Sequence, residues 1–397
     1  MGIKVAMVGT GSFAQSFIPL FKAHPLVDEI VLCDLDGEKL NDNARKHGIS
    51  DTVNSLDEVC ARADIQATAI ITQNWLHAPQ AVQALKAGKH VYSAVPTGIT
   101  LEEIEELVQT VKQTGQVYMI GETSYYYPGV IYCREQFSKG AFGHVVYGEA
   151  EYYHDWDHGL YEVAKWRGGD RWREFAGKPP MYYPTHSTSQ IISVTGATMT
   201  HVSCLGFVDT GDDGIYAENA NPWNNRFSNE SALFRMSDGS ISRINEFRRV
   251  GHPGTVRMAL FGTEGSFEDN TAGTRWVGKK SEDKINLDER LACQGQPVKA
   301  GSDDRMNLVT ASDGTHLGVS QVHPVERLPA SFVGLPNGHA GAHQFLVDDF
   351  VTACVAQKTP PNNVWDAARY AIPGIIAHDS SMRNGEMLPI PDLGDAQ

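Results

Sequence analysis

The chain begins with a short apolar run that leads directly into a glycine-rich turn. Ile3–Val8 is a continuous β-type run, and an apolar-periodic segment typical of a helix follows the turn as far as Phe21. This is the context that the dinucleotide-binding fingerprint requires, with Gly9 allowing the tight bend and Gly11 letting a pyrophosphate approach the backbone. A simple strand-to-helix turn is the alternative. The residues expected to contact a dinucleotide here are Gly9, Gly11, Ser12, Phe13 and Ala14, the last in place of the third glycine.

A carboxylate stands where the second predicted strand ends. Glu29–Cys33 is followed by Asp34, 23 residues beyond Gly11, where a carboxylate can bind the ribose 2′-hydroxyl of a dinucleotide. Leu35 and Asp36 come next, and no arginine is present there to bind a 2′-phosphate. We therefore predict that the cofactor is NAD, with Asp34 and Leu35 beside its adenosine half.

Strands alternate with helices over the first 124 residues, which predicts a doubly wound parallel sheet. Further predicted strands are 67–72, 90–93 and 116–120, and predicted helices are 80–87 and 101–113. We assign residues 1–124 to an NAD-binding Rossmann domain.

The pattern changes after residue 124. Predicted strands 145–153, 202–209, 231–236 and 240–247 follow one another without regular helices between them, which favours a large open, mainly antiparallel sheet with one face available for ligand. Residues 282–331 are polar and irregular, and 343–355 and 365–384 predict two closing helices. We assign 125–397 to a substrate-binding and oligomerisation domain of α/β class.

Composition restricts the partners. The net charge of −15 argues against nucleic acid and anionic membrane surfaces. No apolar stretch is long enough to span a bilayer and the N-terminus lacks the pattern of a signal peptide, so we expect a cytoplasmic protein. The six cysteines form no C-x-x-C pair, which indicates reduced thiols in the core and no zinc site.

Several motifs together resemble the Gfo/Idh/MocA oxidoreductases. They are Ile71-Thr-Gln-Asn-Trp-Leu-His-Ala-Pro79, Ala87-Gly-Lys-His-Val91, Pro96 and Thr100-Leu-Glu-Glu103. The resemblance implies a sugar or polyol enzyme with a Rossmann domain and an open-sheet domain. It also implies that Thr72, Asn74 and His77 line the nicotinamide side of the cofactor site, together with Val95 and Pro96.

Two positions depart from that family. Its usual Glu-Lys-Pro, whose lysine polarises the substrate hydroxyl, is replaced by Ala94-Val95-Pro96, and Val95 cannot exchange a proton. Its usual Asp-x-x-x-His is replaced by Tyr182-Tyr-Pro-Thr-His186, which keeps only the histidine.

One branch of the family is similar in both respects. Tyr183-Pro-Thr-His186 resembles the Y-P-T-H motif of NAD-dependent α-N-acetylgalactosaminidases, and Gly338-His-Ala-Gly-Ala342 resembles a glycine-rich histidine motif of that branch. The resemblance implies redox-neutral glycoside cleavage: the sugar 3-hydroxyl is oxidised, the aglycone is eliminated across C1–C2, water adds, and the ketone is reduced. Tightly bound NAD is then recycled and not consumed.

The candidate catalytic residues are His186 as base and Tyr183 as its hydrogen-bonding or proton-shuttling partner. His339 and His343, four apart, are expected on one face of a helix, with His339 reaching the substrate. Other side chains able to bind a sugar follow the strand that ends near 153 or lie close to the motif; with His339, they are Tyr153, Asp155, Trp156, His158, Arg167 and Tyr182. A metal site built from residues 154–158 is the disfavoured alternative, because the spacing is nonspecific.

Two other functions remain open. A conventional NAD-dependent sugar or glycoside 3-dehydrogenase would need a substitute for the lost lysine, either Lys178 or a residue of 152–158. A non-catalytic NAD or sugar sensor is the second, and intact His186 argues against it. In each case the expected partner is a small carbohydrate, and a homodimer or homotetramer is expected because open sheets usually pair.

Overall fold

The structure, a computed structural model, describes residues 2–280, 282–294 and 315–395; it also leaves out the side chain of Arg167. The first domain is a six-stranded parallel sheet in the order β3-β2-β1-β4-β5-β6. Its strands are β1 (Ile3–Val8), β2 (Val27–Cys33), β3 (Thr52–Val53), β4 (Ala67–Ile70), β5 (His90–Ser93) and β6 (Tyr118–Ile120). The order reverses between β1 and β4, and ligands of such sheets bind at the carboxyl ends of the strands beside that point. The predicted doubly wound sheet is confirmed.

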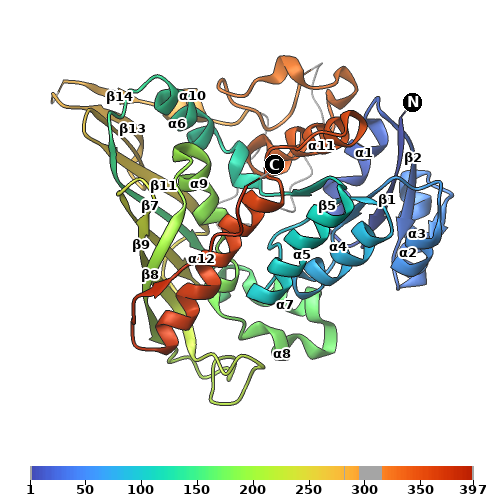
Figure 1. Cartoon of the computed structure of the whole chain (residues 1–397), viewed down its shortest axis with the longest axis horizontal. Helices are drawn as coiled ribbons and strands as arrows, with labels where there is room; N and C mark the ends of the chain where they lie inside the picture. The colour runs from blue at the N-terminus through green and yellow to red at the C-terminus, as the bar shows by residue number, and fades with distance from the viewer. Residues whose placement is uncertain (1, 281, 295–314, 396–397) are drawn as a thin grey trace.

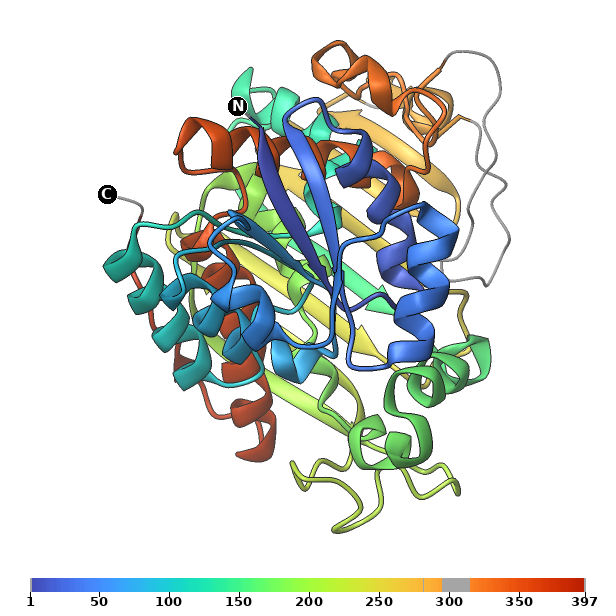
Figure 2. The same cartoon turned by 90° about the vertical axis from the view of Figure 1, so that its right-hand side faces the viewer.

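Helices cover both faces of this sheet (Figures 1 and 2). They are α1 (Ile18–Ala23), α2 (Gly37–His47), α3 (Leu56–Ala61), α4 (His77–Lys86) and α5 (Leu101–Thr114). Side chains cap three of them: Asp36 accepts from two backbone N–H groups at the start of α2, Ser55 accepts from Glu58 at the start of α3, and Thr100 accepts from Glu103 at the start of α5. Gly48 and Gly115, both left-handed, end α2 and α5.

The segment after the glycine turn differs from the single helix that its periodicity predicts. It forms a 3₁₀ helix, η1 (Phe13–Ser16), and only then α1. Pro19 explains the break, because it stands at the start of α1 and has no N–H to continue a hydrogen-bond ladder from the preceding turn.

The second domain is a nine-stranded sheet in the order β14-β13-β12-β11-β7-β10-β9-β8-β15. Only β7 and β10 pair in parallel, so the predicted, mainly antiparallel open sheet is confirmed. The strands are β7 (Val145–Tyr153), β8 (Met199–Val208), β9 (Phe227–Met236), β10 (Ile241–Phe247), β11 (Thr255–Gly262), β12 (Gly265–Asn270), β13 (Gly273–Gly278), β14 (Lys284–Asn286) and β15 (Leu388–Pro389).

Three helices cover the face of this sheet that is turned toward the Rossmann domain (Figure 1). They are α6 (Pro128–Ser138), α9 (Thr185–Thr195) and α12 (Val364–Met382). Strand alternation sorts the side chains: in β9 the even-numbered residues, such as Glu230 and Phe234, are buried beneath the helices, whereas Leu233 on the other face is exposed.

The expectation that no regular helices separate the strands of the second domain is wrong. The helices α7 (Leu160–Gly168), α8 (Trp172–Ala176) and α9 all lie between β7 and β8. The reason is local: α7 and α8 form a small cluster outside the main core, so their apolar residues show little helical periodicity.

The last two long helices pack on different domains. Helix α11 (Gly338–Ala356) lies against the Rossmann core, where Phe345 and Phe350 join Phe21 and Tyr92, whereas α12 packs under the large sheet. The predicted domain division after residue 124 falls inside the 3₁₀ helix η3 (Thr123–Tyr126) and stays a prediction. Cys60 and Cys293 are only partly buried, unlike the other four cysteines. Within the described ranges, no helix has the length and apolarity needed to cross a membrane.

Candidate active site

A cavity runs along the carboxyl ends of the parallel strands, and we call it the cofactor cavity. Among the residues predicted to contact a dinucleotide, those that line it are Gly11, Phe13, Thr72, Asn74, His77 and Val95. His186, Tyr183 and His339 of the second domain also line it. The structure therefore brings the predicted cofactor residues and the predicted catalytic residues together around one space.

The glycine turn has a geometric requirement at its first position. Gly9 has φ +89°, and a Cβ added there would lie 2.4 Å from the carbonyl oxygen of Ile71. A side chain would therefore push β1 and the loop after β4 apart. Ala14 is fully buried behind the turn, where it packs in the Rossmann core, and Ser12 stands at the start of η1.

Asp34 is held by its own turn. Its Oδ2 accepts hydrogen bonds from the backbone and hydroxyl of Thr10, both at 2.8 Å, and pairs with Lys39 at 2.9 Å. Burial opposes ionisation, but these contacts outweigh it and keep the pKa of Asp34 below its usual value. Leu35 beside it is 87% exposed, so a flat apolar surface is available next to the carboxylate. Lys39 is the one cation here that sequence reasoning did not single out.

The loop after β4 is fixed by His77. Its ring nitrogens contact the carbonyl oxygens of Pro96, at 2.9 Å, and of Thr72, at 3.2 Å, so it links the loop to the turn that carries Val95. Asn74 Oδ1 is buried and finds no hydrogen-bond partner among the described residues. An unsatisfied polar atom in this wall, together with the glycine turn, fits a bound dinucleotide with a polar nicotinamide end.

The candidate catalytic histidine has a buried partner that sequence reasoning missed. His186, on α9, places Nδ1 2.7 Å from Oε1 of Glu122, which follows β6 and is fully buried. Burial disfavours the carboxylate, but the nearby His186 and hydrogen bonds outweigh it and lower the pKa of Glu122. An ionised Glu122 accepts from Nδ1–H, and Nε2 is then the nitrogen available as a base.

Tyr152, Tyr183 and His339 surround His186. Their ring centroids lie 5.4, 5.3 and 6.5 Å from that of His186. The Tyr152 hydroxyl in turn lies 3.0 Å from Nδ1 of His154. The result is a compact group of imidazoles and phenols, and groups of this kind can pass protons between one another and a hydroxylated ligand.

His339 and His343 touch, but not as two residues on one helical face. His339, Ala340 and Gly341 all have positive φ, so regular helix begins only after Gly341. The contact, 2.8 Å between Nδ1 of His339 and Nε2 of His343, depends on this left-handed turn. The expectation of an i, i+4 helical pair is therefore wrong. The glycine-rich motif forms a left-handed turn before the helix, so His339 is not part of the regular helix that carries His343.

The remaining predicted substrate residues are dispersed. Tyr153 and His158 line a cavity on the β11 side, and Trp156 lines another beside α7. Asp155 accepts backbone hydrogen bonds from Asp157 and Val250, and Tyr182 packs against His378 and lines none of these cavities. Arg167 belongs to α7, but its side chain lies outside the described part of the structure.

We call the cavity on the β11 side the histidine cavity. Five histidines contribute to its lining: His154, His158, His186, His252 and His339. No group of three or more His, Cys, Asp or Glu side chains in the described residues is arranged to hold a metal ion. Two of these histidines, His186 and His339, also line the cofactor cavity, so the two cavities meet at the candidate base.

The fold and this cavity define an NAD-binding Rossmann domain joined to an open-sheet domain across a shared site. Residues 3–122 match the oxidoreductase family with the NAD-binding Rossmann fold. This part of the chain is therefore similar to the Gfo/Idh/MocA oxidoreductases, in agreement with its motifs.

Relatives are found over almost the whole chain. A glycosyl hydrolase family 109 protein of Saccharopolyspora erythraea is 23% identical, with 98% of this chain and 83% of that protein covered. Another, of Solibacter usitatus, is 25% identical, with 96% and 86% covered.

Solved structures share the fold. Levoglucosan dehydrogenase in complex with NADH matches with a TM-score of 0.74 at 17% identity, covering 99% of this chain and 100% of that one. Myo-inositol 2-dehydrogenase from Lactobacillus plantarum matches with a TM-score of 0.69 at 16% identity, covering 98% and 100%.

Proposed function

We propose that this protein is an NAD-dependent glycoside hydrolase or lyase whose cofactor is unchanged after a full cycle. The observation that carries this proposal is the position of His186. It is hydrogen-bonded to Glu122 and lines both the cofactor cavity and the histidine cavity, which supports a role for it between a cofactor in the first and a substrate in the second. The names of the full-length relatives support a sugar as the substrate.

Bound NAD would supply oxidation and later reduction at carbon 3 of the sugar. His186 Nε2 takes the proton of the 3-hydroxyl. A ketone at carbon 3 acidifies the proton on carbon 2, and its removal breaks the bond between carbon 1 and the aglycone oxygen. The Tyr183 hydroxyl, beside His186, donates the proton that this oxygen needs. Water then adds at carbon 1 and a proton returns to carbon 2.

Val95 supports the redox-neutral route. It lines the cofactor cavity at the position where the wider family has its lysine, and it can neither polarise a hydroxyl nor carry a proton. Proton transfer at this wall is thus left to His186 and the side chains around it. Trp166 of α7 supports retention of the cofactor, because its ring lies 3.4 Å from where a Cβ of Gly11 would be and so lies against the glycine turn.

The experiment is incubation of the purified protein with aryl glycosides of both anomers and NAD in D₂O. We expect aglycone release, deuterium at carbon 2 and no net NADH. His186→Ala should lower the rate by about 10²–10⁴-fold, the usual contribution of a general base. Tyr182→Phe is the matched control, because it lies in the same motif yet lines none of the three cavities. Stoichiometric NADH with a 3-keto glycoside and no aglycone would refute the proposal.

That refuting result would indicate the second candidate, a conventional NAD-dependent sugar or glycoside 3-dehydrogenase. One contact favours it: Lys178 Nζ lies 5.1 Å from the ring centroid of Tyr183, so a lysine is present near the reacting groups. In that case Lys178→Met should abolish oxidation. For the redox-neutral enzyme, we also propose a cytoplasmic homodimer or homotetramer that purifies with NAD bound.

A further inference from the structure

A third cavity opens beside the reaction centre, and we call it the aromatic cavity. Seven tryptophan, tyrosine and phenylalanine side chains line it: Trp75, Tyr152, Trp156, Trp172, Phe175, Tyr183 and Tyr216. Its cavity volume is about 100 Å³, of the same order as the roughly 150 Å³ apolar cavity that binds benzene.

The aromatic cavity is joined to the reaction centre. It shares Asn74 and Tyr183 with the cofactor cavity, and Tyr152 and His154 with the histidine cavity. A sugar ring held at His186, with carbon 3 toward the cofactor, therefore has room on one side for a substituent on carbon 1.

Stacking and packing hold the aromatic walls. Trp75, from the Rossmann loop after β4, stacks on Phe175 of α8 with ring centroids 4.0 Å apart and planes 8° apart. On the opposite wall Trp156, Ile215 and Tyr216 form a small core of their own, and Trp156 Nε1 donates to the Tyr216 hydroxyl at 3.3 Å. Both domains thus contribute to one cavity.

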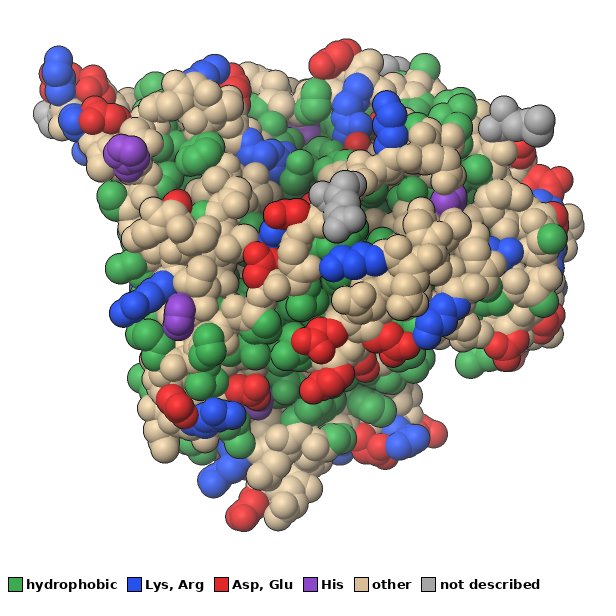
Figure 3. Space-filling model, viewed as in Figure 1, with side chains coloured by type: hydrophobic (Ala, Val, Ile, Leu, Met, Phe, Trp, Pro, Cys, Tyr) green, Lys and Arg blue, Asp and Glu red, His purple; other side chains and the backbone are tan. Residues whose placement is uncertain are grey.

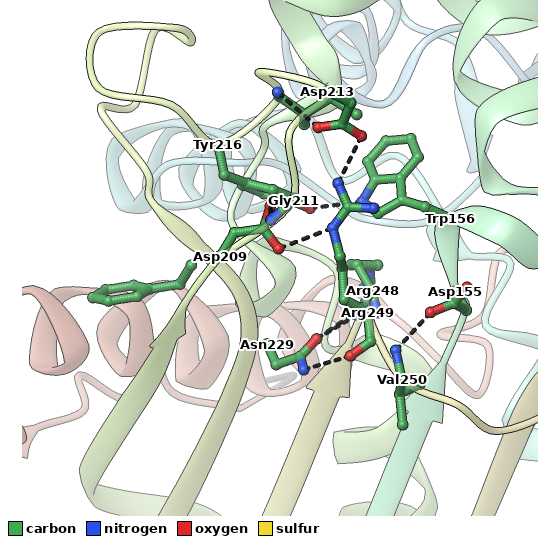
Figure 4. Close-up of polar contacts among 12 residues, drawn as sticks. Asp155, Trp156, Asp209, Gly211, Asp213, Tyr216, Asn229, Arg248, Arg249 and Val250 are labelled. Atoms are coloured by element: carbon green, nitrogen blue, oxygen red, sulfur yellow. Dashed lines mark hydrogen bonds and ion pairs between the residues drawn. The ribbon is translucent and has the colours of Figure 1, made fainter.

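Ion pairs fix the segment that carries Tyr216 (Figure 4). Arg249, just beyond β10, bonds Asp209 at 2.9 Å and Asp213 at 2.6 Å. Next to it, Asn229 accepts from the backbone N–H groups of Arg248 and Arg249, both at 2.9 Å. The loop between β8 and β9 is therefore tied to the sheet, and the wall stands ready before a ligand enters.

The chemistry of the walls favours one class of ligand. Leu160, Val163 and Ala164 of α7 add apolar surface between the rings. Among the polar groups of the lining, Arg248 is hydrogen-bonded to Glu246 and His154 to Tyr152. Most of the lining is aromatic or aliphatic, so each hydroxyl of a second sugar buried there would need one of its few polar groups as a partner, whereas a planar aromatic ring needs none.

We infer that the aromatic cavity is a leaving-group subsite that takes an aromatic aglycone, so that the substrates are aryl glycosides. The inference rests on the proposed function, and elimination agrees with it, because a phenol-type oxygen (pKa about 10) leaves more readily than an alcohol. Glycosides of phenols therefore place an aromatic ring in the cavity and carry a leaving group that favours the elimination.

The test compares phenyl and methyl glycosides of the same sugar. Wild type should favour the phenyl glycoside in kcat/KM by about ten- to a hundredfold. Ala164→Phe, which fills the cavity, should reduce that ratio toward one, and so should Leu160→Gln, which keeps the side-chain volume. Glu162→Phe is the control, because Glu162 is exposed on the same helix and the ratio should not change. Equal use of both glycosides by the wild type would overturn the inference and leave the proposed function standing.

A binding measurement separates the two proposals. Three tryptophans line the cavity, so free 4-nitrophenol should quench protein fluorescence with a saturable curve in wild type and in Glu162→Phe, but not in Ala164→Phe. If no glycoside is cleaved and this pattern holds, the aromatic-binding site stands while the proposed function fails. Absence of saturable quenching in the wild type would overturn the aromatic site itself.

Discussion

Glu122 determines which ring nitrogen of His186 is left for the proposed substrate. The carboxylate is fully buried, and its hydrogen bond to Nδ1 directs Nε2 away from it. Glu122→Gln keeps the size and an acceptor oxygen but removes the charge that stabilises a protonated imidazole. We therefore expect the turnover rate to fall by at least about tenfold and the acid limb of the pH–rate profile to move to lower pH.

The shift of the acid limb distinguishes a Glu122 that positions His186 from a Glu122 that only supports the fold. Steady-state kinetics between pH 5 and 9 measure it, with Tyr182→Phe as the reference. An unchanged limb with a lower rate at every pH would mean that Glu122 only supports the fold. Glu122→Asp, which restores the charge, should restore the position of the limb.

Glu246 gives a pH dependence to stability. It lies beneath α9, where Ser187 donates to it at 2.6 Å and Arg248 at 3.0 Å, and burial raises its pKa to about 8 from an ordinary 4.5. Between those values the folded protein holds a proton that the unfolded chain has released. Its contribution to the free energy of unfolding is therefore fully present below pH 4.5 and is lost as the pH rises through 8.

Glu246→Gln should remove that part of the dependence. Urea unfolding at pH 5 and pH 8 measures it: the loss of stability between the two should be smaller in the variant than in the wild type. The exposed Glu105→Gln should behave as the wild type does. Equal slopes for all three would mean that Glu246 is ionised in the folded protein.

The sequence identified His186 and Tyr183 because a motif surrounds them, but it did not identify Glu122 or Tyr152. Glu122 is a single acid after β6, with no spacing that relates it to residue 186. At the end of β7, the residue predicted to bind the substrate was Tyr153. Because side chains alternate along a strand, it is Tyr152 that faces His186. Whether the even-numbered or the odd-numbered residues of a strand face the site depends on which side of the sheet the helices cover. That is decided by tertiary packing and cannot be read from the strand's own sequence.

The entry into α11 illustrates a strained element at a functional site. His339, Ala340 and Gly341 are consecutive residues with positive φ, and a Cβ on Gly341 would lie 2.5 Å from the carbonyl oxygen of Gly318. The turn brings His339 to the junction of the cofactor and histidine cavities. Strain held in this way by the surrounding structure is typical of ligand-binding segments.

Gly341→Ala should therefore disturb both stability and the site. Left-handed backbone costs a non-glycine residue roughly 1–2 kcal/mol, and the contact with Gly318 adds to it. We expect a lower melting temperature and weaker NAD binding, measured by scanning calorimetry and by titration. Gly88→Ala is the matched control, since Gly88 has φ +77° with nothing within 4 Å of an added Cβ; it should lose stability alone. Unchanged NAD affinity in Gly341→Ala would separate this turn from the site.

The bounds of strands and helices could be predicted from the sequence where one face of the element is apolar along its whole length. Strands β1 and β5 and helix α5 lie within a residue of the predicted ranges, because the Rossmann core buries them regularly. Helices α7 and α8 were missed, since they pack in a small separate cluster with the β8–β9 loop and against Trp75, outside the main cores. Their apolar residues serve a local cluster and the aromatic cavity, so no single helical face is marked in the sequence.

The two sheets face different surroundings. The Rossmann sheet is covered by helices on both faces, whereas α6, α9 and α12 all lie on one face of the nine-stranded sheet (Figure 1). In Figure 3 acidic and basic side chains are intermixed over the visible face, so the net charge of −15 is not gathered into one patch there. The uncovered face of the nine-stranded sheet carries several exposed apolar residues.

Those residues belong to neighbouring strands. Leu205 and Phe207 of β8, Leu233 of β9 and Ile241 of β10 are 64%, 53%, 52% and 45% exposed, and the register of the strands places them on the same outer face. Exposed apolar groups gathered on one face are typical of an interface between subunits. In a two-fold dimer each of these residues would be buried in both subunits, because the same surface of each subunit forms the interface.

Leu233→Lys should therefore shift the proposed homodimer or homotetramer toward monomer. The new cation would stand opposite Arg243 on β10, so the pair of like charges would have to be buried in any interface through this face. Light scattering after size exclusion, over a range of protein concentrations, measures the mass. Val355→Lys, an exposed apolar position on α11, is the control and should keep the wild-type mass. If Leu233→Lys keeps it as well, the subunits do not associate through this sheet.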